Sequence, residues 1–150
     1  MIALIRQRTR HDCAICTIAM ALDRAYDEVH AAGVESKGFD PEVGTRSEQG
    51  ILKHLGLSST YENGRAVGDF IDTRKGYETS TEAFRDRAWG RRAILTVPSL
   101  NIVGGWHSVY WTGSQLLDPC LLKTYESFDQ LHPTEMILFR ECGVSIAQAA

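Results

Sequence analysis

Four residues have the types and spacing needed for covalent catalysis by a thiol. Cys13 opens an apolar segment and follows Gln7 by six positions, His107 lies in the segment WHSVYW, and Asp118 lies in LLDP. A cysteine thiolate is a strong nucleophile, an imidazole can accept and return its proton, and a carboxylate can orient that imidazole. A glutamine amide, together with the backbone N–H of the cysteine, can donate hydrogen bonds to the oxyanion that such a reaction forms.

Cys13 is expected in the first turn of an α-helix that runs to Tyr26. Asp12 stands at the N-cap position, where short polar side chains are favoured. The apolar positions that follow recur at helical spacing: Ile15, Ile18, Ala19, Leu22 and Tyr26. The unpaired amides and the dipole of a helix N-terminus favour an anion, so this position favours the thiolate form of Cys13, and a nearby His107 imidazolium would favour it further.

A hairpin is expected to bring Asp118 to His107. If Gly113 and Ser114 form a two-residue turn, the numbers of opposed residues sum to a constant and His107 faces Cys120. Asp118 is then the diagonal neighbour of His107, with Cβ atoms roughly 7 Å apart, a gap that the two side chains can close. A loop longer by one residue would send Asp118 to the other face, so the prediction depends on this register.

The elements that must position these residues indicate an α+β domain. A short strand or extended segment is expected over 3–9, and helices are expected over 13–26, 24–33, 45–57 and 80–90. The helix over 45–57 is capped by Thr45 or Ser47 and ended by Gly56. The helix over 80–90 is capped by Ser80 or Thr81 and ended by Gly90. Strands are expected over 91–100, 106–113, 115–125 and 135–142. Helices first and strands afterwards predict N-terminal helices packed on a C-terminal antiparallel sheet.

The bulk properties are those of one soluble domain. A chain of 150 residues fits a single core over residues 1–150, and its formal net charge of -3 argues against a general nucleic-acid binder. No window approaches the roughly 18 apolar residues of a transmembrane helix, and no secretory signal is recognisable, so a cytoplasmic location is expected. The four cysteines, Cys13, Cys16, Cys120 and Cys142, are therefore expected to be thiols.

Taken together, these motifs resemble a known peptidase family. Gln7, the pair Asp12–Cys13 opening an apolar helix, WHSVYW and LLDP resemble the papain-like cysteine peptidases that process bacteriocin leader peptides at double-glycine sites, and their stand-alone relatives. The likeness extends to residues 44–57, similar to that family's middle helix, and to residues 91–99, similar to the strand before the histidine hairpin. It covers nearly the whole chain.

The resemblance implies a papain-like fold and a peptide or protein substrate. It makes Cys13 the nucleophile, His107 the general base and acid, Asp118 the residue that orients His107, and Gln7 the oxyanion-hole residue, with no metal or organic cofactor required. Two features depart from the family: Ala14 replaces the usual glycine after the cysteine, and no transporter or ATPase region accompanies the domain. The second departure puts a double-glycine substrate in doubt.

Other chemistry is compatible with the cysteines. Cys13 and Cys16 form a C-x-x-C at a helix start, a redox motif in thioredoxin-like folds, with Pro98 as a candidate partner. That fold places the motif after a strand within a βαβ unit, which the short segment before Cys13 does not provide. A zinc site of Cys13, Cys16, His107 and Cys120 lacks a second closely spaced pair. Cys16 is expected to pack in the core, and oxidation could join it to Cys13.

Three functions remain open from the sequence. The first is peptide-bond hydrolysis; the second is another acyl transfer or a deamidation by the same triad, because fold and triad do not determine the acyl acceptor. The third is a peptide-binding module without turnover. Residues 61–80 are expected to be a variable insert beside a substrate cleft, the arginines Arg6, Arg8 and Arg10 a basic edge, and the tryptophans parts of the core or of a cleft wall: Trp89, Trp106 and Trp111.

Overall fold

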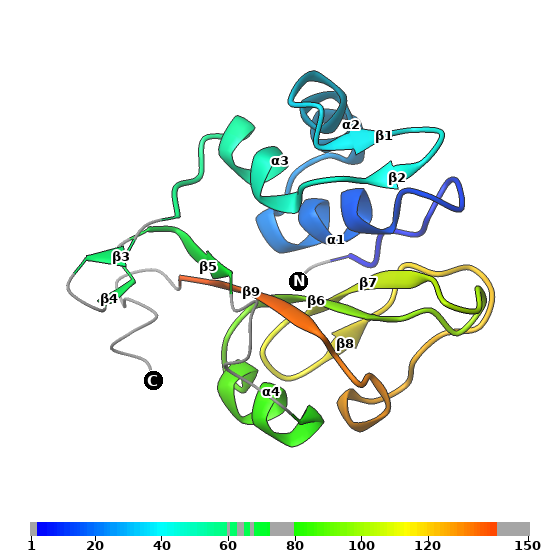
Figure 1. Ribbon diagram of the computed structural model, residues 1–150, viewed down its shortest axis with the longest axis vertical. Coiled ribbons are helices and arrows are strands. Elements are labelled where there is room, and N and C mark those ends of the chain that lie inside the picture. The colour runs from blue at the N-terminus through cyan, green and yellow to red at the C-terminus, as the bar shows by residue number, and fades with distance from the viewer. Residues whose placement is uncertain (1–2, 60, 63–64, 67, 73–79, 141–150) are drawn as a thin grey trace.

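The protein is a mixed α+β structure in which helices cover both faces of one antiparallel sheet (Figure 1). The computed structural model describes residues 3–59, 61–62, 65–66, 68–72 and 80–140. Within these ranges the α-helices are α1 (Cys13–Leu22), α2 (Tyr26–Glu35), α3 (Glu48–His54) and α4 (Thr81–Ala88), and a 3-10 turn spans Phe128–Gln130. The α+β class and the antiparallel sheet predicted from the sequence are thereby confirmed.

The main sheet has five strands in the order β5-β9-β6-β7-β8, all neighbours antiparallel. Its strands are β5 (Phe70–Asp72), β6 (Ala93–Pro98), β7 (Trp106–Trp111), β8 (Leu116–Leu117) and β9 (Glu135–Phe139). Two small hairpins lie outside it, β1 (Phe39–Asp40) with β2 (Gly44–Thr45) and β3 (Tyr61–Glu62) with β4 (Arg65–Ala66). None of the helices in the described part of the chain is long and apolar enough to cross a bilayer.

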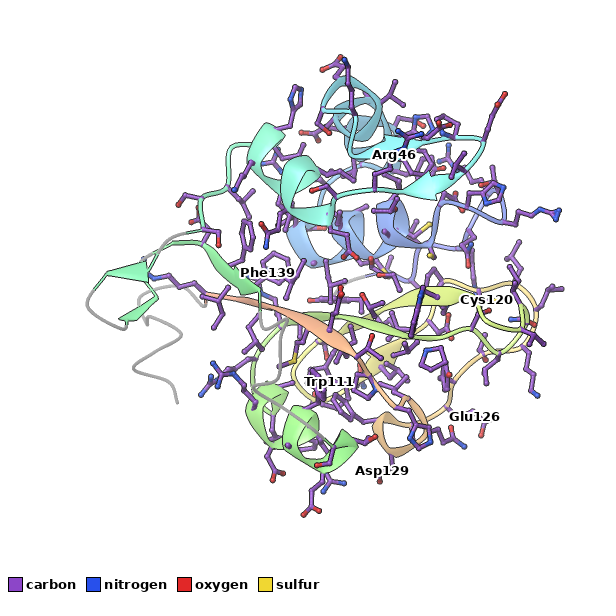
Figure 2. All side chains as sticks on the ribbon, in the orientation of Figure 1. Arg46, Trp111, Cys120, Glu126, Asp129 and Phe139 are labelled. Carbon is purple, nitrogen blue, oxygen red and sulfur yellow. The ribbon has the colours of Figure 1, made fainter. Side chains whose placement is uncertain are left out.

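Two hydrophobic clusters form the core, one on each face of the sheet. On the face that α1 covers, Tyr110 and Phe139 pack with Ile15 and Ile18 of the helix. On the opposite face, Trp111 packs with Phe84 of α4 and other apolar side chains. Figure 2 shows Phe139 and Trp111 on these two sides. Because neighbouring residues of a strand point to opposite faces, β7 contributes to both clusters.

Helix α1 begins where the sequence predicts and ends earlier. Its first residue is Cys13, but it stops at Leu22, since Asp23 adopts a left-handed conformation with φ 51° and ψ 49°. Tyr26, predicted as the last apolar position of this helix, instead begins α2. The expected range of 13–26 is therefore wrong at its C-terminal end, because the tight turn at Asp23 redirects the chain.

The capping residues of α3 and α4 agree with the predictions. The Ser47 hydroxyl accepts a hydrogen bond from the Gly50 N–H, and the Ser80 hydroxyl accepts one from the Ala83 N–H. Both helices are shorter than the predicted ranges of 45–57 and 80–90, and both are followed by a glycine with positive φ, at 92° for Gly56 and 75° for Gly90. Glycine adopts this conformation at little cost because it has no Cβ atom.

The register of the β7–β8 hairpin is the predicted one. Tyr110 pairs with Leu117 and Trp111 pairs with Leu116, so opposed residues have the expected constant sum. The turn holds two residues and begins at Gly113, whose φ of 111° suits glycine. A Cβ atom at that position would lie 3.1 Å from backbone atoms of residues 90 and 91, so space as well as conformation selects glycine.

Several predicted strands are shorter than expected. The expected strand over 115–125 is only Leu116–Leu117, because Asp118 turns its carboxylate back onto backbone N–H groups of the following loop. Residues 3–9 form no strand, although the Gln7 N–H donates to the Pro119 carbonyl at 2.9 Å. The expected insert over 61–80 instead contributes β5 to the sheet edge, and residues 73–79, like Cys142, lie outside the described residues.

Candidate active site

The structure brings Cys13, His107 and Asp118 together at one end of the sheet. Cys13 is the first residue of α1, His107 is the second residue of β7, and these two elements pack directly against each other. His107 Nε2 donates to Asp118 Oδ1 at 2.6 Å, and the side chain of Cys13 is close enough to the imidazole to raise its pKa. Since Nε2 is engaged by Asp118, Nδ1 is the ring nitrogen left for the thiol. The arrangement is a thiol, an imidazole and a carboxylate in series.

Asp118 is a buried carboxylate whose two oxygens both accept hydrogen bonds. Its Oδ1 accepts from the Cys120 N–H at 2.9 Å as well as from His107, and its Oδ2 accepts from the Tyr125 N–H at 3.0 Å. Burial alone would raise the pKa of this carboxyl group, but the hydrogen bonds from His107 and the two backbone groups outweigh it and lower the pKa. Asp118 therefore remains an anion beside the imidazole.

His107 is held in its protonated form by its two neighbours. Burial alone would lower the pKa of His107, but hydrogen bonds to Asp118 and Cys13, together with the negative charges of both, raise it to about 10. The side chain of His107 is only 11% exposed, so solvent screens these interactions weakly. An imidazolium in this position carries a proton that can be transferred.

A pair of buried hydroxyl groups ties the helix of Cys13 to the strand of His107. Thr17 Oγ1 donates to the Ala14 carbonyl at 3.0 Å and lies 2.8 Å from Ser108 Oγ. A hydroxyl has one hydrogen, so Ser108 must be the donor to Thr17. Because Ser108 directly follows His107, this bond sets the position of His107 relative to the first turn of α1.

Gln7 lies in the loop before α1, with its amide turned toward that loop. Its Nε2 donates to the Thr9 carbonyl at 3.1 Å and lies 3.5 Å from Asp12 Oδ1. Its backbone N–H bonds to Pro119, next to Asp118, so Gln7 is anchored beside the site. Gln7 and Asp118 are not among the residues that line the cleft described next, and the oxyanion role of Gln7 stays a prediction.

A cleft of about 960 Å³ opens beside Cys13 and His107. Its helical side is lined by the segment 43–49, where Figure 2 labels Arg46, and by Arg10, His11, Cys13 and Ala14. Residues of β6, β7 and β9 line the other side. Three apolar side chains on its wall are more than half exposed: Val43, Ile102 and Trp106. A cleft with apolar walls and a few polar groups is the usual form of a binding site for an organic ligand.

The other cysteines have different surroundings. Cys16 is fully buried, and burial, followed by the charges of Asp12 and Cys13, raises the pKa of its thiol. The Cys120 sulfur accepts hydrogen bonds from the Asn101 amide at 3.2 Å and from the Leu122 N–H at 3.5 Å. Within the residues that the structure describes, no cluster of three or more His, Cys, Asp or Glu side chains could hold a metal ion.

The interactions of two features near the site, the Asp12 side chain and the Thr17–Ser108 pair, do not follow from the sequence analysis. Asp12 was expected to cap α1, but its side chain makes no bond to the helix and turns into the preceding loop. The Thr17–Ser108 pair was not expected at all. A signal for it exists in the sequence, because a serine within the apolar strand WHSVYW requires a hydrogen-bond partner once it is buried.

No protein-family model matches this chain, and the search of curated proteins likewise returned no match.

Proposed function

We propose that the protein is a cysteine peptidase with a papain-like arrangement of a nucleophile-bearing helix against an antiparallel sheet. The observation that carries the proposal is the series of Cys13, His107 and Asp118: Asp118 bonds the imidazole at 2.6 Å, and Cys13 interacts with that imidazole where both residues line a cleft. A nucleophile at a helix N-terminus, next to a base that a third group orients, is the general pattern of covalent acyl transfer.

The reaction begins with attack of the Cys13 thiolate on a scissile carbonyl carbon. A sulfur–carbon bond forms, the carbonyl becomes an oxyanion, and the Cys13 N–H together with Gln7 donates to it. His107 then gives its proton to the leaving amine as the carbon–nitrogen bond breaks. Water next attacks the thioester with His107 accepting a proton, which releases the acid and restores the thiolate. Asp118 holds the imidazole in the required tautomer throughout.

Alkylation of Cys13 by iodoacetamide tests whether Cys13 and His107 form a thiolate–imidazolium pair. In wild type, Cys13 should react fast at pH values well below those at which an ordinary thiol ionises, and His107→Ala should abolish this. His54→Ala is a matched control, because His54 also bonds a carboxylate, at 3.0 Å from Glu35, but on the surface. A Cys13 that reacts like an ordinary thiol in all three proteins would contradict the proposed function.

A digest of a peptide library identifies the acyl acceptor. Cleaved peptides indicate a peptidase, and a mass increase of about one unit without cleavage indicates a deamidase. Tight binding without any product indicates a binding module. Cys13→Ala should abolish either product while leaving binding in place, because the substitution removes only the sulfur.

A further inference from the structure

Asp12 is a completely buried carboxylate directly before Cys13. Four hydrogen-bond donors converge on it. Oδ2 accepts from the Arg8 N–H at 2.9 Å and the Tyr26 hydroxyl at 2.7 Å, and Oδ1 accepts from the Thr9 N–H at 3.3 Å and the Gln7 amide at 3.5 Å. Two carboxylate oxygens offer about four lone-pair sites, so these donors use the acceptor capacity of Asp12.

The donors show what Asp12 holds. Three of them belong to the loop of residues 7–12, and the fourth belongs to α2, so the carboxylate fastens that loop to the helix behind it. The guanidinium of Arg8 lies 3.8 Å from the centre of the Tyr26 ring and bonds Asp27, which adds a second connection between the same two segments. The loop that leads into Cys13 is therefore built around one side chain.

The charge of Asp12 has the wrong sign for activating the nucleophile. A carboxylate close to a thiol opposes formation of the thiolate. Its field does reach the first turn of α1, because the charge of Asp12, after burial, is among the causes that raise the pKa of Cys16. A buried anion beside an anionic nucleophile is electrostatically unfavourable. The four hydrogen bonds to Asp12 offset this cost, and their effect is to fix the position of the loop.

Gln7 is the member of that loop with a predicted chemical role. Its backbone is attached to Pro119, and its side chain lies between the Thr9 carbonyl and Asp12. The 3.5 Å separation from Asp12 is near the outer limit of a hydrogen bond. The Gln7 side-chain N–H that faces Asp12 can turn toward a developing oxyanion at little cost, while the bond to the Thr9 carbonyl keeps the amide nearby.

We propose that Asp12 is a positioning residue that holds Gln7 where its amide can stabilise the oxyanion formed on Cys13. This inference rests on the proposed function, because an oxyanion forms only if Cys13 carries out acyl transfer. On this inference, the role of Asp12 is to hold the loop and Gln7 in place. It is neither to cap α1 nor to promote formation of the thiolate.

Two reagents separate positioning from thiolate formation. Iodoacetamide alkylates the thiolate by displacement of iodide, without an oxyanion on the attacked carbon. p-Nitrophenyl acetate acylates it through a tetrahedral oxyanion: a sulfur–carbon bond forms, and the carbon–oxygen bond breaks to release p-nitrophenolate with its electron pair. The ratio of acylation rate to alkylation rate therefore reports oxyanion stabilisation. Rates are corrected with Cys13→Ala, and the ratio is compared with that of free cysteine.

Asp12→Asn should lower this ratio without slowing alkylation. Asparagine offers one oxygen to four donors, so the loop loses its fixed form. The substitution also removes the negative charge that opposes formation of the thiolate. Gln7→Ala should lower the ratio by roughly 10², and Asp12→Asn by roughly tenfold or more, a part of the same effect. The double variant should be no lower than Gln7→Ala, since both substitutions act through one group. Glu28→Gln, which removes the acidic member of the surface pair with Arg24 and touches no residue of the loop, should leave the ratio unchanged.

The outcomes distinguish the two proposals. A wild-type ratio no higher than that of free cysteine contradicts the proposed function itself. A raised wild-type ratio that Gln7→Ala lowers and Asp12→Asn does not lower contradicts only the role of Asp12, as does an additive double variant. If Asp12→Asn fails to fold, Tyr26→Phe removes one of the four donors with little change of shape. That variant should lower the ratio roughly two- to tenfold, and an unchanged ratio would overturn the inference.

Discussion

Replacing Asp118 by asparagine should flatten the dependence of folding stability on pH. The pKa of His107 is about 10 in the folded protein against 6.5 for a free histidine; burial opposes this rise, and the interactions with Asp118 and Cys13 outweigh burial. Because the pKa is higher in the folded state, the contribution of His107 to stability is fully present below pH 6.5. It is lost as the pH rises from there through about 10.

The size of the effect follows from the two pKa values. Linkage predicts that the free energy of unfolding falls by about 2 kcal/mol between pH 6 and pH 8, with His107 as the only group considered. Asp118→Asn removes one of the two charges that raise the pKa, so this slope should become shallower. Asparagine also offers a single oxygen to three donors, so the variant should be less stable at every pH by about 1–3 kcal/mol.

Urea unfolding at pH 6, 7 and 8 measures both quantities. Glu35→Gln is the matched control, because Glu35 and His54 form a similar pair at 3.0 Å with side chains 67% and 41% exposed. Exposed pairs contribute little, so this variant should differ from wild type by less than about 0.5 kcal/mol at each pH. The reasoning is refuted if Asp118→Asn keeps the wild-type slope, or if Glu35→Gln changes the slope as much as Asp118→Asn does.

Three further predictions concern the surroundings of the site. Thr17→Val and Ser108→Ala should show a coupling free energy of about 1 kcal/mol in a double-mutant cycle of urea unfolding, because each removes the same buried hydrogen bond; additive effects would mean that the bond contributes nothing. Cys16 should remain unreactive toward Ellman's reagent in the native protein because it is fully buried, while Cys13 reacts; equal labelling of both would contradict this. Gly113→Ala should lower the free energy of unfolding by roughly 1–3 kcal/mol, since alanine must adopt a positive φ and crowd the backbone at Arg91; unchanged thermal stability would show that the turn can rearrange.

Local rules were sufficient for the parts of the site that depend on nearby residues. The start of α1 at Cys13 follows from apolar spacing, and the caps at Ser47 and Ser80 follow from side-chain chemistry. The approach of Asp118 to His107 follows from turn length alone, because strand side chains alternate and a two-residue turn sets the register. Each of these depends on residues close in sequence.

Contacts between distant segments decided the features that the sequence did not reveal. The strand β5, within residues expected to be an insert, exists because β9 offers it an edge to pair with. Asp12 satisfies the rule for a helix cap, but the Tyr26 hydroxyl and three donors of the preceding loop compete successfully for its carboxylate. The small hairpin of β1 and β2 has too few residues for a recognisable alternation.

The hydrogen bond from Gln7 to Pro119 has a consequence for how the molecule is assembled. It joins the beginning of the chain to the segment that carries Asp118, so the surroundings of Cys13 are completed by residues far away in sequence. Contacts of this kind form late in folding, because closing a long loop costs entropy before any interaction compensates for it. A chain that has made α1 but not β7 has the thiol without its base. Chemical reactivity at Cys13 should therefore arise in a refolding experiment together with the sheet and not with the helix.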